Sequence, residues 1–435
     1  MPLGLYISLP FCRTKCSYCN FASGVFSPAA FQNYVERLCL DIARAPQTAG
    51  QMGGCFEPRA DTIYFGGGTP TILDVTQLEQ LFVTIRQNFQ IGPEAEITIE
   101  CAPGTLSAKM LETLVRCGVN RLSLGVQSFV DEEARAVGRL HTRAVARDDI
   151  ARLRAAGIAN INLDLIAGLP HQTPASWEFS LSEALAAGAP HISVYMLEID
   201  EDSRLGRELI AGGTKYHAHF VPDENLTAEL YESACERLGT AGIAQYEISN
   251  FARAGWESRH NLKYWTRQPY LGFGVDAHSM LYCAGLKACA STVVELAQTG
   301  TQSNTAEKDA RAVRFATPDS LEAYLAGAPL RPASVSTQSA LEEAFFLGLR
   351  LTQGVNLESI AAQFGEEAVS PLFAMFAELS DLGLLTRQGE ILRLTARGRL
   401  LSNEVFERFL AEPRSCGDGA PPRPVGLRPA SAQPL

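Results

Sequence analysis

Three cysteines near the start of the chain have a spacing that suits an iron–sulfur cluster. Cys12, Cys16 and Cys19 follow a C-x3-C-x2-C pattern directly after a short β-rich run. Three thiolates can hold three irons of a cubane and leave the fourth iron open for a small molecule. A structural zinc site normally needs four ligands, and no second cysteine pair follows nearby to complete one. The spacing therefore favours a [4Fe-4S] cluster over zinc or three incidental buried thiols.

Other polar and glycine residues stand at the ends of further β-rich runs. Gly67, Gly68 and Thr69 follow one run, while Glu100 and Asp164 stand at the ends of two others. The carboxyl ends of parallel strands meet at one edge, where α/β barrels hold their chemistry. A carboxylate flanked by apolar strand residues normally requires a partner. We expect these residues to share a site with the cysteines, although helix capping or ion pairing would also account for the two acids.

Six β-rich runs, separated by amphipathic helical stretches, must position these residues. The runs cover residues 5–9, 62–65, 96–101, 121–125, 160–165 and 191–197, and the helical stretches cover residues 28–45, 75–88, 107–117, 143–156 and 175–187. This alternation predicts a parallel sheet, and periodicity alone does not separate an open sheet from a barrel. Because the polar motifs gather at strand ends, we predict an α/β fold with a partial (β/α)6 barrel over residues 1–200.

The remaining sequence divides into three parts. Residues 201–331 are less regular and predict an accessory layer, with a helix over 224–238, a strand over 244–251 and a loop-rich segment over 254–278. Residues 332–411 predict a winged-helix-like helical domain, because helices over 339–351, 357–364 and 371–382 precede a hairpin over 384–394. Residues 412–435 are rich in Pro, Gly, Ser and Ala and predict a disordered tail.

Composition limits the classes of protein to consider. The chain has 435 residues, 46% of them hydrophobic, without a signal peptide or an apolar run of membrane-spanning length, so we expect a cytoplasmic protein. The net charge is −11, and residues 339–410 hold six Arg and no Lys against ten Asp or Glu. Nucleic-acid binding relies on clustered positive charge, so we expect no nucleic-acid partner.

The cysteine pattern after an opening strand resembles the signature of the radical S-adenosylmethionine superfamily. Further residues follow an order similar to that of oxygen-independent coproporphyrinogen oxidase, over nearly the whole chain up to residue 410: Tyr6, Tyr18, Gly67, Gly68, Thr69, Glu100, Gln127, Arg139 and Asp164. The resemblance implies that S-adenosylmethionine chelates the open iron and that an electron donor reduces the cluster, which cleaves the cofactor to a 5′-deoxyadenosyl radical. It also implies that these nine residues bind the cofactor. For Arg139, a solvated surface charge is the alternative.

Two departures from the oxidase and one added motif indicate a different branch. Phe21 stands where the oxidase pattern has another cysteine, and only a few residues precede the first strand. Residues 260–265 read H-N-x-x-Y-W, which resembles the mark of a family of heme chaperones. That resemblance implies heme as a ligand and an acceptor hemoprotein, membrane-associated or not, as a partner.

The H-N-x-x-Y-W segment has suitable chemistry for heme. A neutral imidazole of His260 can bind heme iron, and Tyr264 with Trp265 can cover a macrocycle face. The alternative is that His260 holds a loop by hydrogen bonds while the aromatic rings pack in the core. His217, His219, His278 and Cys283 are further candidate ligands.

Three functions therefore compete: a heme-transfer chaperone, a coproporphyrinogen oxidase that decarboxylates by radical chemistry, and a radical enzyme with another substrate. We prefer the chaperone and expect no coproporphyrinogen oxidase activity.

Overall fold

The computed structural model of the chain describes residues 1–283 and 311–410. The predicted tail over 412–435 lies outside the described residues. Six parallel strands form the centre of the main sheet in the order β1-β3-β4-β5-β6-β7. Their bounds are β1 Leu3–Leu9, β3 Arg59–Gly67, β4 Gln90–Cys101, β5 Arg121–Gln127, β6 Asn160–Ala167 and β7 His191–Met196. The predicted parallel α/β fold is confirmed, and the described strands form an open sheet.

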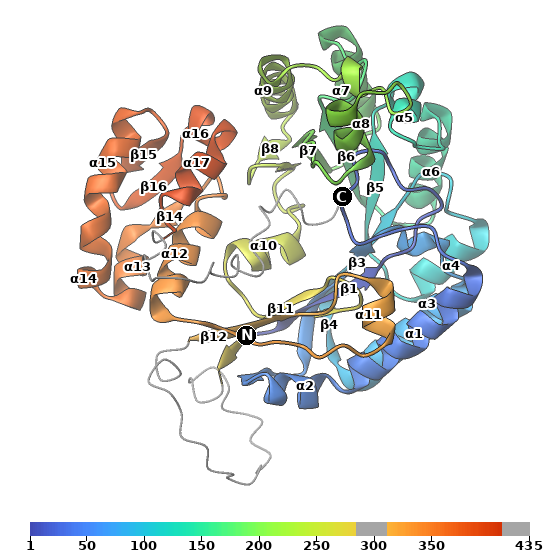
Figure 1. The fold of residues 1–435 in the computed structure, drawn as a ribbon, viewed down its shortest axis with the longest axis horizontal. Coiled ribbons are helices and arrows are strands. Elements are labelled where there is room, and N and C mark those ends of the chain that lie inside the picture. Colours follow the sequence, from blue (N-terminus) through green and yellow to red (C-terminus); the bar gives the residue numbers. More distant parts are fainter. Residues whose placement is uncertain (284–310, 411–435) are drawn as a thin grey trace.

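Helices between these strands cover the outer face of the curved sheet, as Figure 1 shows for α1, α3, α4 and α6. The helices are α1 Pro28–Ala43, α2 Ala45–Gln51, α3 Val75–Asn88, α4 Ala108–Arg116, α5 Asp131–Ala136, α6 Arg143–Ala155 and α7 Pro174–Ala186. Local sequence sets where they begin. Asp74 and Gln77 form a capping box at the start of α3, and Thr173 caps α7 ahead of Pro174.

The two faces of each central strand differ in polarity. In β6, Asn162 and Asp164 hydrogen-bond to neighbouring strands, whereas Ile161, Leu163 and Leu165 belong to the main hydrophobic core. Side chains alternate between the faces of a strand, so the apolar set packs under the helices and the polar set points into the barrel. The interior of the barrel is therefore a polar layer that can hold ligands.

The sheet continues beyond the parallel strands at both edges. Beside β1 lie the parallel strand β10 (Tyr270–Phe273) and then β11 (His278–Cys283), β12 (Ala312–Ala316) and β13 (Ala333–Val335), with β2 (Gly54–Cys55) paired to β11. Beside β7 lie β9 (Asn250–Ala252) and β8 (Ala244–Gln245). The strand predicted over 244–251 is thus two short strands joined by a turn, and the loop-rich segment contains α10 (Arg259–Trp265) as well as β10.

One irregular segment lies over the cysteine loop. It contains α8 (Arg204–Ala211) and the short helix η2 (Ala218–Phe220), followed by α9 (Glu224–Thr240). The amide of Leu205 donates to the carbonyl of Ser17 at 2.8 Å, and Arg204 donates to the carbonyl of Lys15 at 3.0 Å. We name residues 200–221 the α8–η2 segment.

The C-terminal part has a hydrophobic core of its own. It consists of α12 (Thr337–Gly348), β14 (Val355–Asn356), α13 (Leu357–Phe364), α14 (Glu366–Val369), α15 (Phe373–Asp381), β15 (Leu385–Gln388), β16 (Ile391–Leu394), α16 (Ala396–Leu400) and α17 (Ser402–Glu407). The predicted hairpin is confirmed, and β14 adds a third strand to it. Figure 1 shows this helical domain beside the barrel, adjoining α10. None of the described helices has the length and apolar character needed to cross a membrane.

Candidate cofactor site

A pocket at the carboxyl edge of the parallel strands gathers most of the predicted site residues. Its empty volume, including its opening to solvent, is about 570 Å³. It is lined by Cys12, Thr14, Lys15, Cys16, Tyr18, Cys19, Phe21, Ser23, Gly67, Gly68, Thr69, Glu100, Cys101, Ala102, Ser123, Gly125, Gln127, Arg139 and Asp164. The three predicted cluster cysteines and eight of the nine predicted cofactor residues are in this set, and Tyr6 is the exception.

The cysteine loop carries three free thiols at the pocket wall. Arg139 donates from Nη1 to Cys16 Sγ at 3.5 Å, and the hydroxyl of Ser23 lies 3.8 Å from Cys19 Sγ. Among the described residues, no three His, Cys, Asp or Glu side chains are close enough to hold a single metal ion. A mononuclear zinc site requires such convergence, whereas a cubane binds each thiolate to a different iron. Three free thiols on one pocket wall are the donor set that a cluster with one open iron needs.

Burial affects the chemistry of these thiols. It raises the pKa of the Cys12 thiol to about 11 and also raises the pKa of Cys19. Thiols in this state are protonated at neutral pH, and they must lose their protons to bind iron. Binding of iron by these thiols would therefore release protons.

The glycine run after β3 allows two backbone segments to approach closely. The amide of Gly68 donates to the carbonyl of Leu9 at 2.8 Å, and that of Thr69 donates to the carbonyl of Phe11 at 2.7 Å. A Cβ on Gly68 would lie 2.6 Å from the carbonyl oxygen of Phe11. Gly67 has φ +103°, a conformation that favours glycine. These glycines thus attach the end of β3 to the residues that lead into Cys12.

Two buried carboxylates define the polar side of the pocket. Glu100 accepts from the Tyr64 hydroxyl at 2.9 Å and from the Gly67 amide at 3.2 Å. Asp164 accepts from Ser123 at 2.9 Å and from Asn162 at 2.7 Å. Burial raises the pKa of both carboxyls, and the proximity of Asp164 raises that of Glu100 further. Both groups can accept hydrogen bonds from a polar ligand.

Gln127 provides an unused acceptor in the same pocket. Its Oε1 atom is buried and has no hydrogen-bond partner within the described part of the chain. The residue ends β5 with φ 68°, a left-handed conformation that is uncommon outside glycine. A buried polar atom without a partner costs about 1–3 kcal/mol. A ligand with a hydroxyl or amine donor would relieve that cost, so this site fits the nucleoside and amino-acid groups of S-adenosylmethionine.

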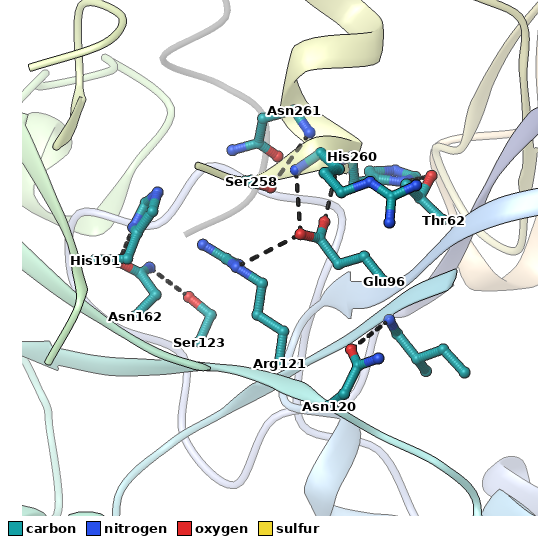
Figure 2. A network of polar contacts seen from close by, with 12 residues as sticks. Thr62, Glu96, Asn120, Arg121, Ser123, Asn162, His191, Ser258, His260 and Asn261 are labelled. Atoms are coloured by element: carbon teal, nitrogen blue, oxygen red, sulfur yellow. Dashed lines mark hydrogen bonds and ion pairs between the residues drawn. The ribbon is translucent and has the colours of Figure 1, made fainter. Parts of the chain in front are cut away.

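The H-N-x-x-Y-W residues lie on α10, against the polar interior of the barrel. Figure 2 shows the carboxylate of Glu96 below the start of this helix, with Arg121 on its other side. Glu96 accepts from the amides of Arg259 at 3.1 Å and His260 at 3.0 Å. A carboxylate at a helix start satisfies amides that lack partners within the helix. Glu96 therefore anchors α10 to β4.

Both ring nitrogens of His260 are engaged. Nδ1 lies 2.9 Å from the Thr62 hydroxyl, and Nε2 lies 2.8 Å from the Tyr264 hydroxyl. The side chain is 1% exposed, and burial lowers its pKa to about 3, so the imidazole is neutral. Tyr6 belongs to this interior group, with its ring centre 6.4 Å from that of His260. Iron ligation by His260 remains a prediction, and it would require loss of one of these two hydrogen bonds.

Trp265 connects α10 to the C-terminal domain. The guanidinium of Arg350 lies 4.4 Å from the Trp265 ring centre, and Arg350 also pairs with Glu247 at 3.5 Å. The Tyr264 ring packs edge-on against Tyr270 of β10 at 4.6 Å. In this structure the aromatic pair of the motif is packed between elements. Contact of Tyr264 and Trp265 with a heme face stays a prediction.

Sequence reasoning missed the side chains that support the pocket. Lys15 donates to the carbonyl of Phe21 at 2.9 Å, which closes the cysteine loop. Asn162 donates to both Ser123 and Asp164, and it also contacts His191 of β7 (Figure 2). The signal for Asn162 was present in the alternation of polar and apolar residues along β6. No feature of the sequence pointed to Lys15.

An open six-stranded parallel barrel, with a three-cysteine loop and a polar pocket at its carboxyl edge, defines a radical S-adenosylmethionine protein. The model of the Radical SAM superfamily matches residues 6–184, and that of the HemN C-terminal domain matches residues 335–401. The superfamily implies a [4Fe-4S] cluster and S-adenosylmethionine as cofactors, which the pocket fits.

Comparison with whole proteins identifies the family within this superfamily. The chain is 35% identical to the heme chaperone HemW of Bacillus subtilis, over 94% of this chain and 99% of that protein. It is 34% identical to the heme chaperone HemW of a Synechocystis species, over 94% and 92% of the two chains. The chain belongs to the family of the heme chaperone HemW. The fold is similar to that of coproporphyrinogen III oxidase (HemN) from Escherichia coli, at TM-score 0.75 and 24% identity, over 94% of this chain and 90% of the other.

Proposed function

We propose that this protein binds heme and transfers it to an acceptor hemoprotein, membrane-associated or not, while it holds a [4Fe-4S] cluster with S-adenosylmethionine at the open iron. The observation that carries the proposal is similarity to heme chaperones along 94% of the chain, together with a pocket lined by the three cysteines and eight of the nine predicted cofactor residues. Phe21 adds support, because it lines the pocket at the position where the oxidase pattern has a cysteine.

Within this proposal, Cys12, Cys16 and Cys19 hold the cluster, which supplies an electron to the bound cofactor when a donor reduces it. The chain's own groups bind and orient S-adenosylmethionine. Gly67, Gly68 and Thr69 line the pocket next to the cysteine loop and are proposed to contact the methionine moiety. Glu100, Gln127 and Asp164 provide buried acceptors for its hydroxyl and amine groups, and Arg139 provides a donor for its carboxylate.

The first step of the test establishes the cofactor state. Anaerobically reconstituted protein should contain about four iron and four sulfide per chain. Cys12→Ala, Cys16→Ala and Cys19→Ala should each remove the cluster, because each thiolate holds one iron. Cys39→Ala is the matched control, since Cys39 lies on α1 outside the pocket and should leave the iron content unchanged.

The second step separates the chaperone from the oxidase. The reconstituted protein, with dithionite and S-adenosylmethionine, should bind added hemin and should leave coproporphyrinogen III unconverted. Hemin binding is followed by the Soret band, and coproporphyrinogen turnover by chromatography of the oxidised porphyrins. Sustained formation of protoporphyrinogen would reject the chaperone in favour of the oxidase. Absence of hemin binding would also reject the proposal.

A further inference from the structure

Three of the seven histidines lie together outside the cofactor pocket, on the α8–η2 segment and the turn after β6. The ring atoms His171 Nε2 and His217 Nδ1 are 2.9 Å apart. His219 follows two residues after His217 and is exposed. Neither His171 nor His217 lines the pocket that we assign to S-adenosylmethionine.

The other four histidines are held in structural contacts. His191 is buried, with Nδ1 at 2.6 Å from Asn162 and Nε2 at 3.0 Å from Tyr246, and His260 is bonded at both nitrogens as described above. His141 is buried, and its Nε2 atom lies 3.2 Å from the carbonyl of Val126. His278 lies on β11, with Nε2 at 3.8 Å from Asp276. His219 is exposed and His171, His217 and His278 are half-buried, so the α8–η2 region holds three of the four histidines that reach the surface.

Backbone contacts hold the two imidazoles against each other. The amide of His171 donates to the carbonyl of Phe220 at 2.9 Å, and that of Phe220 donates to the carbonyl of His217 at 2.9 Å. The Glu208 carboxylate accepts from the amides of Tyr216 at 2.7 Å and Ala218 at 3.1 Å. His171 has φ 69° and His217 has φ 60°, the left-handed region in which Asn, Asp and His are the non-glycine residues found most often. The pair is thus fixed by the fold.

We propose that Nε2 of His217 is the axial ligand of the heme iron, with His171 as its positioning partner. This inference rests on the proposed heme-binding function. A metal-binding histidine normally donates its second ring N–H to a neighbouring acceptor, which fixes the tautomer. His217 with its proton on Nδ1 donates to Nε2 of His171, and this leaves its own Nε2 lone pair for iron. No described residue hydrogen-bonds to that atom.

The surroundings suit an amphipathic macrocycle. The ring of Phe220 is stacked on His171 at 4.3 Å and is 57% exposed, and α8 exposes Leu209 and Ile210 at 46% and 68%. Covering exposed apolar area contributes about 25 cal/mol per Å². Arg207 and Lys215 are exposed on the same segment and offer positive charge to the two heme carboxylates. The segment therefore combines an imidazole, apolar cover and cations within a net acidic chain.

The position of this site has a consequence for the cofactors. The α8–η2 segment bonds directly to the cysteine loop at Ser17 and Lys15, yet its histidines lie outside the nucleoside pocket. Heme at His217 would therefore leave the nucleoside pocket free, so heme and S-adenosylmethionine can be bound at the same time.

The test compares two histidines that are two residues apart. Hemin and metal-free protoporphyrin IX are titrated separately into the reconstituted full chain and into His217→Asn and His219→Asn. Asparagine tolerates the left-handed backbone of residue 217, so the segment keeps its path. We expect His217→Asn to weaken hemin binding at least about tenfold and to change the ferric Soret band, with recovery of the band on addition of free imidazole. His219→Asn should stay within about twofold of the unsubstituted chain, a difference of less than about 0.5 kcal/mol.

The metal-free porphyrin separates ligation from surface contact. His217→Asn should bind protoporphyrin IX as the unsubstituted chain does, because no iron bond is involved. His171→Asn should move the Soret band of bound hemin while costing less affinity than His217→Asn, as expected of a positioning residue.

Several outcomes would reject the ligand. Unchanged hemin binding and spectrum in His217→Asn would reject it while leaving the proposed function intact. An equal loss of hemin affinity in His219→Asn would also reject His217 as the ligand. A loss of protoporphyrin IX binding in His217→Asn would reject it as well. If the unsubstituted chain failed to bind hemin, the proposed function would fail together with this inference.

Discussion

At the scale of single residues, the pocket contains two carboxyl groups that are buried without a cationic partner. Among the described residues, neither Glu100 nor Asp164 forms an ion pair within 4.0 Å. Burial raises the pKa of both, so ionising them in the folded chain costs free energy. Groups that weaken a fold and line a pocket commonly serve a ligand, and the donors of S-adenosylmethionine would offset the cost here.

Glu100→Gln tests this interpretation of the pocket. The pKa of Glu100 is higher in the folded chain than in the unfolded chain, so its contribution to stability is present at low pH and lost as the pH rises through the folded value. The variant should therefore be more stable than the unsubstituted chain at pH 8, by about 1 kcal/mol or more, and closest to it near pH 5. Thermal melts of the cofactor-free protein measure this difference.

The same variant should bind S-adenosylmethionine about tenfold more weakly, because a charged acceptor is lost. Its iron content should stay normal, since Glu100 is not a cluster ligand. If Glu100→Gln were less stable than the unsubstituted chain at pH 8 and also bound S-adenosylmethionine more weakly, the carboxylate would have a structural role. Glu390→Gln, on an exposed turn residue, is the control and should shift neither property.

At the scale of elements, the turn after β3 carries the link between sheet and cluster. Gly68→Ala would place a methyl group against the Phe11 backbone, which cannot move as a flexible side chain does. We expect this variant to displace the start of the cysteine loop and to lower iron per chain well below about four. Gly50→Ala is the matched control, because Gly50 lies on α2 with no atom within 4 Å of the added carbon. Full iron content in Gly68→Ala would contradict the proposed coupling.

Local sequence signals predicted the bounds of helices and strands far better than the contacts between distant elements. The helices α3 and α13 have the predicted bounds, since capping residues and apolar spacing are local properties. The site residues at strand ends were equally predictable, because one edge of a parallel sheet collects them. The position of α10 could not be predicted, because it depends on Glu96, which precedes the helix by over 160 residues. The pairing of His171 with His217 likewise appears only when β6 and η2 are brought together.

At the scale of the whole molecule, ion pairs join the C-terminal domain to the barrel. Glu343 of α12 accepts from Arg267 after α10 and from Arg314 of β12, each at 2.9 Å. Arg350, whose guanidinium lies over the Trp265 ring, also pairs with Glu247. Two arginines share one carboxylate, so its loss would leave two charges without a partner.

Glu343→Gln should loosen this attachment. Removing one partner of a fully buried ion pair costs about 3–5 kcal/mol, and we expect about 2–3 kcal/mol because the neighbouring arginines are partly exposed. Hydrogen exchange should increase over α12 and α10 before it increases in the central strands. Equal exchange in the variant and the unsubstituted chain would show that apolar packing alone holds the domain in place.

The parallel pairing of β1 with β10 also determines when the sheet can be completed during synthesis of the chain. Leu5 pairs with Leu271, so β1 must wait for residues made more than 260 positions later before one of its edges is covered. At about 5–20 residues per second, that interval is roughly 15–50 s. During this time the nascent chain has a hydrophobic strand with unpaired backbone groups beside the cysteine loop. Shielding of this edge during translation, rather than the stability of the finished fold, would then limit the yield of intact protein.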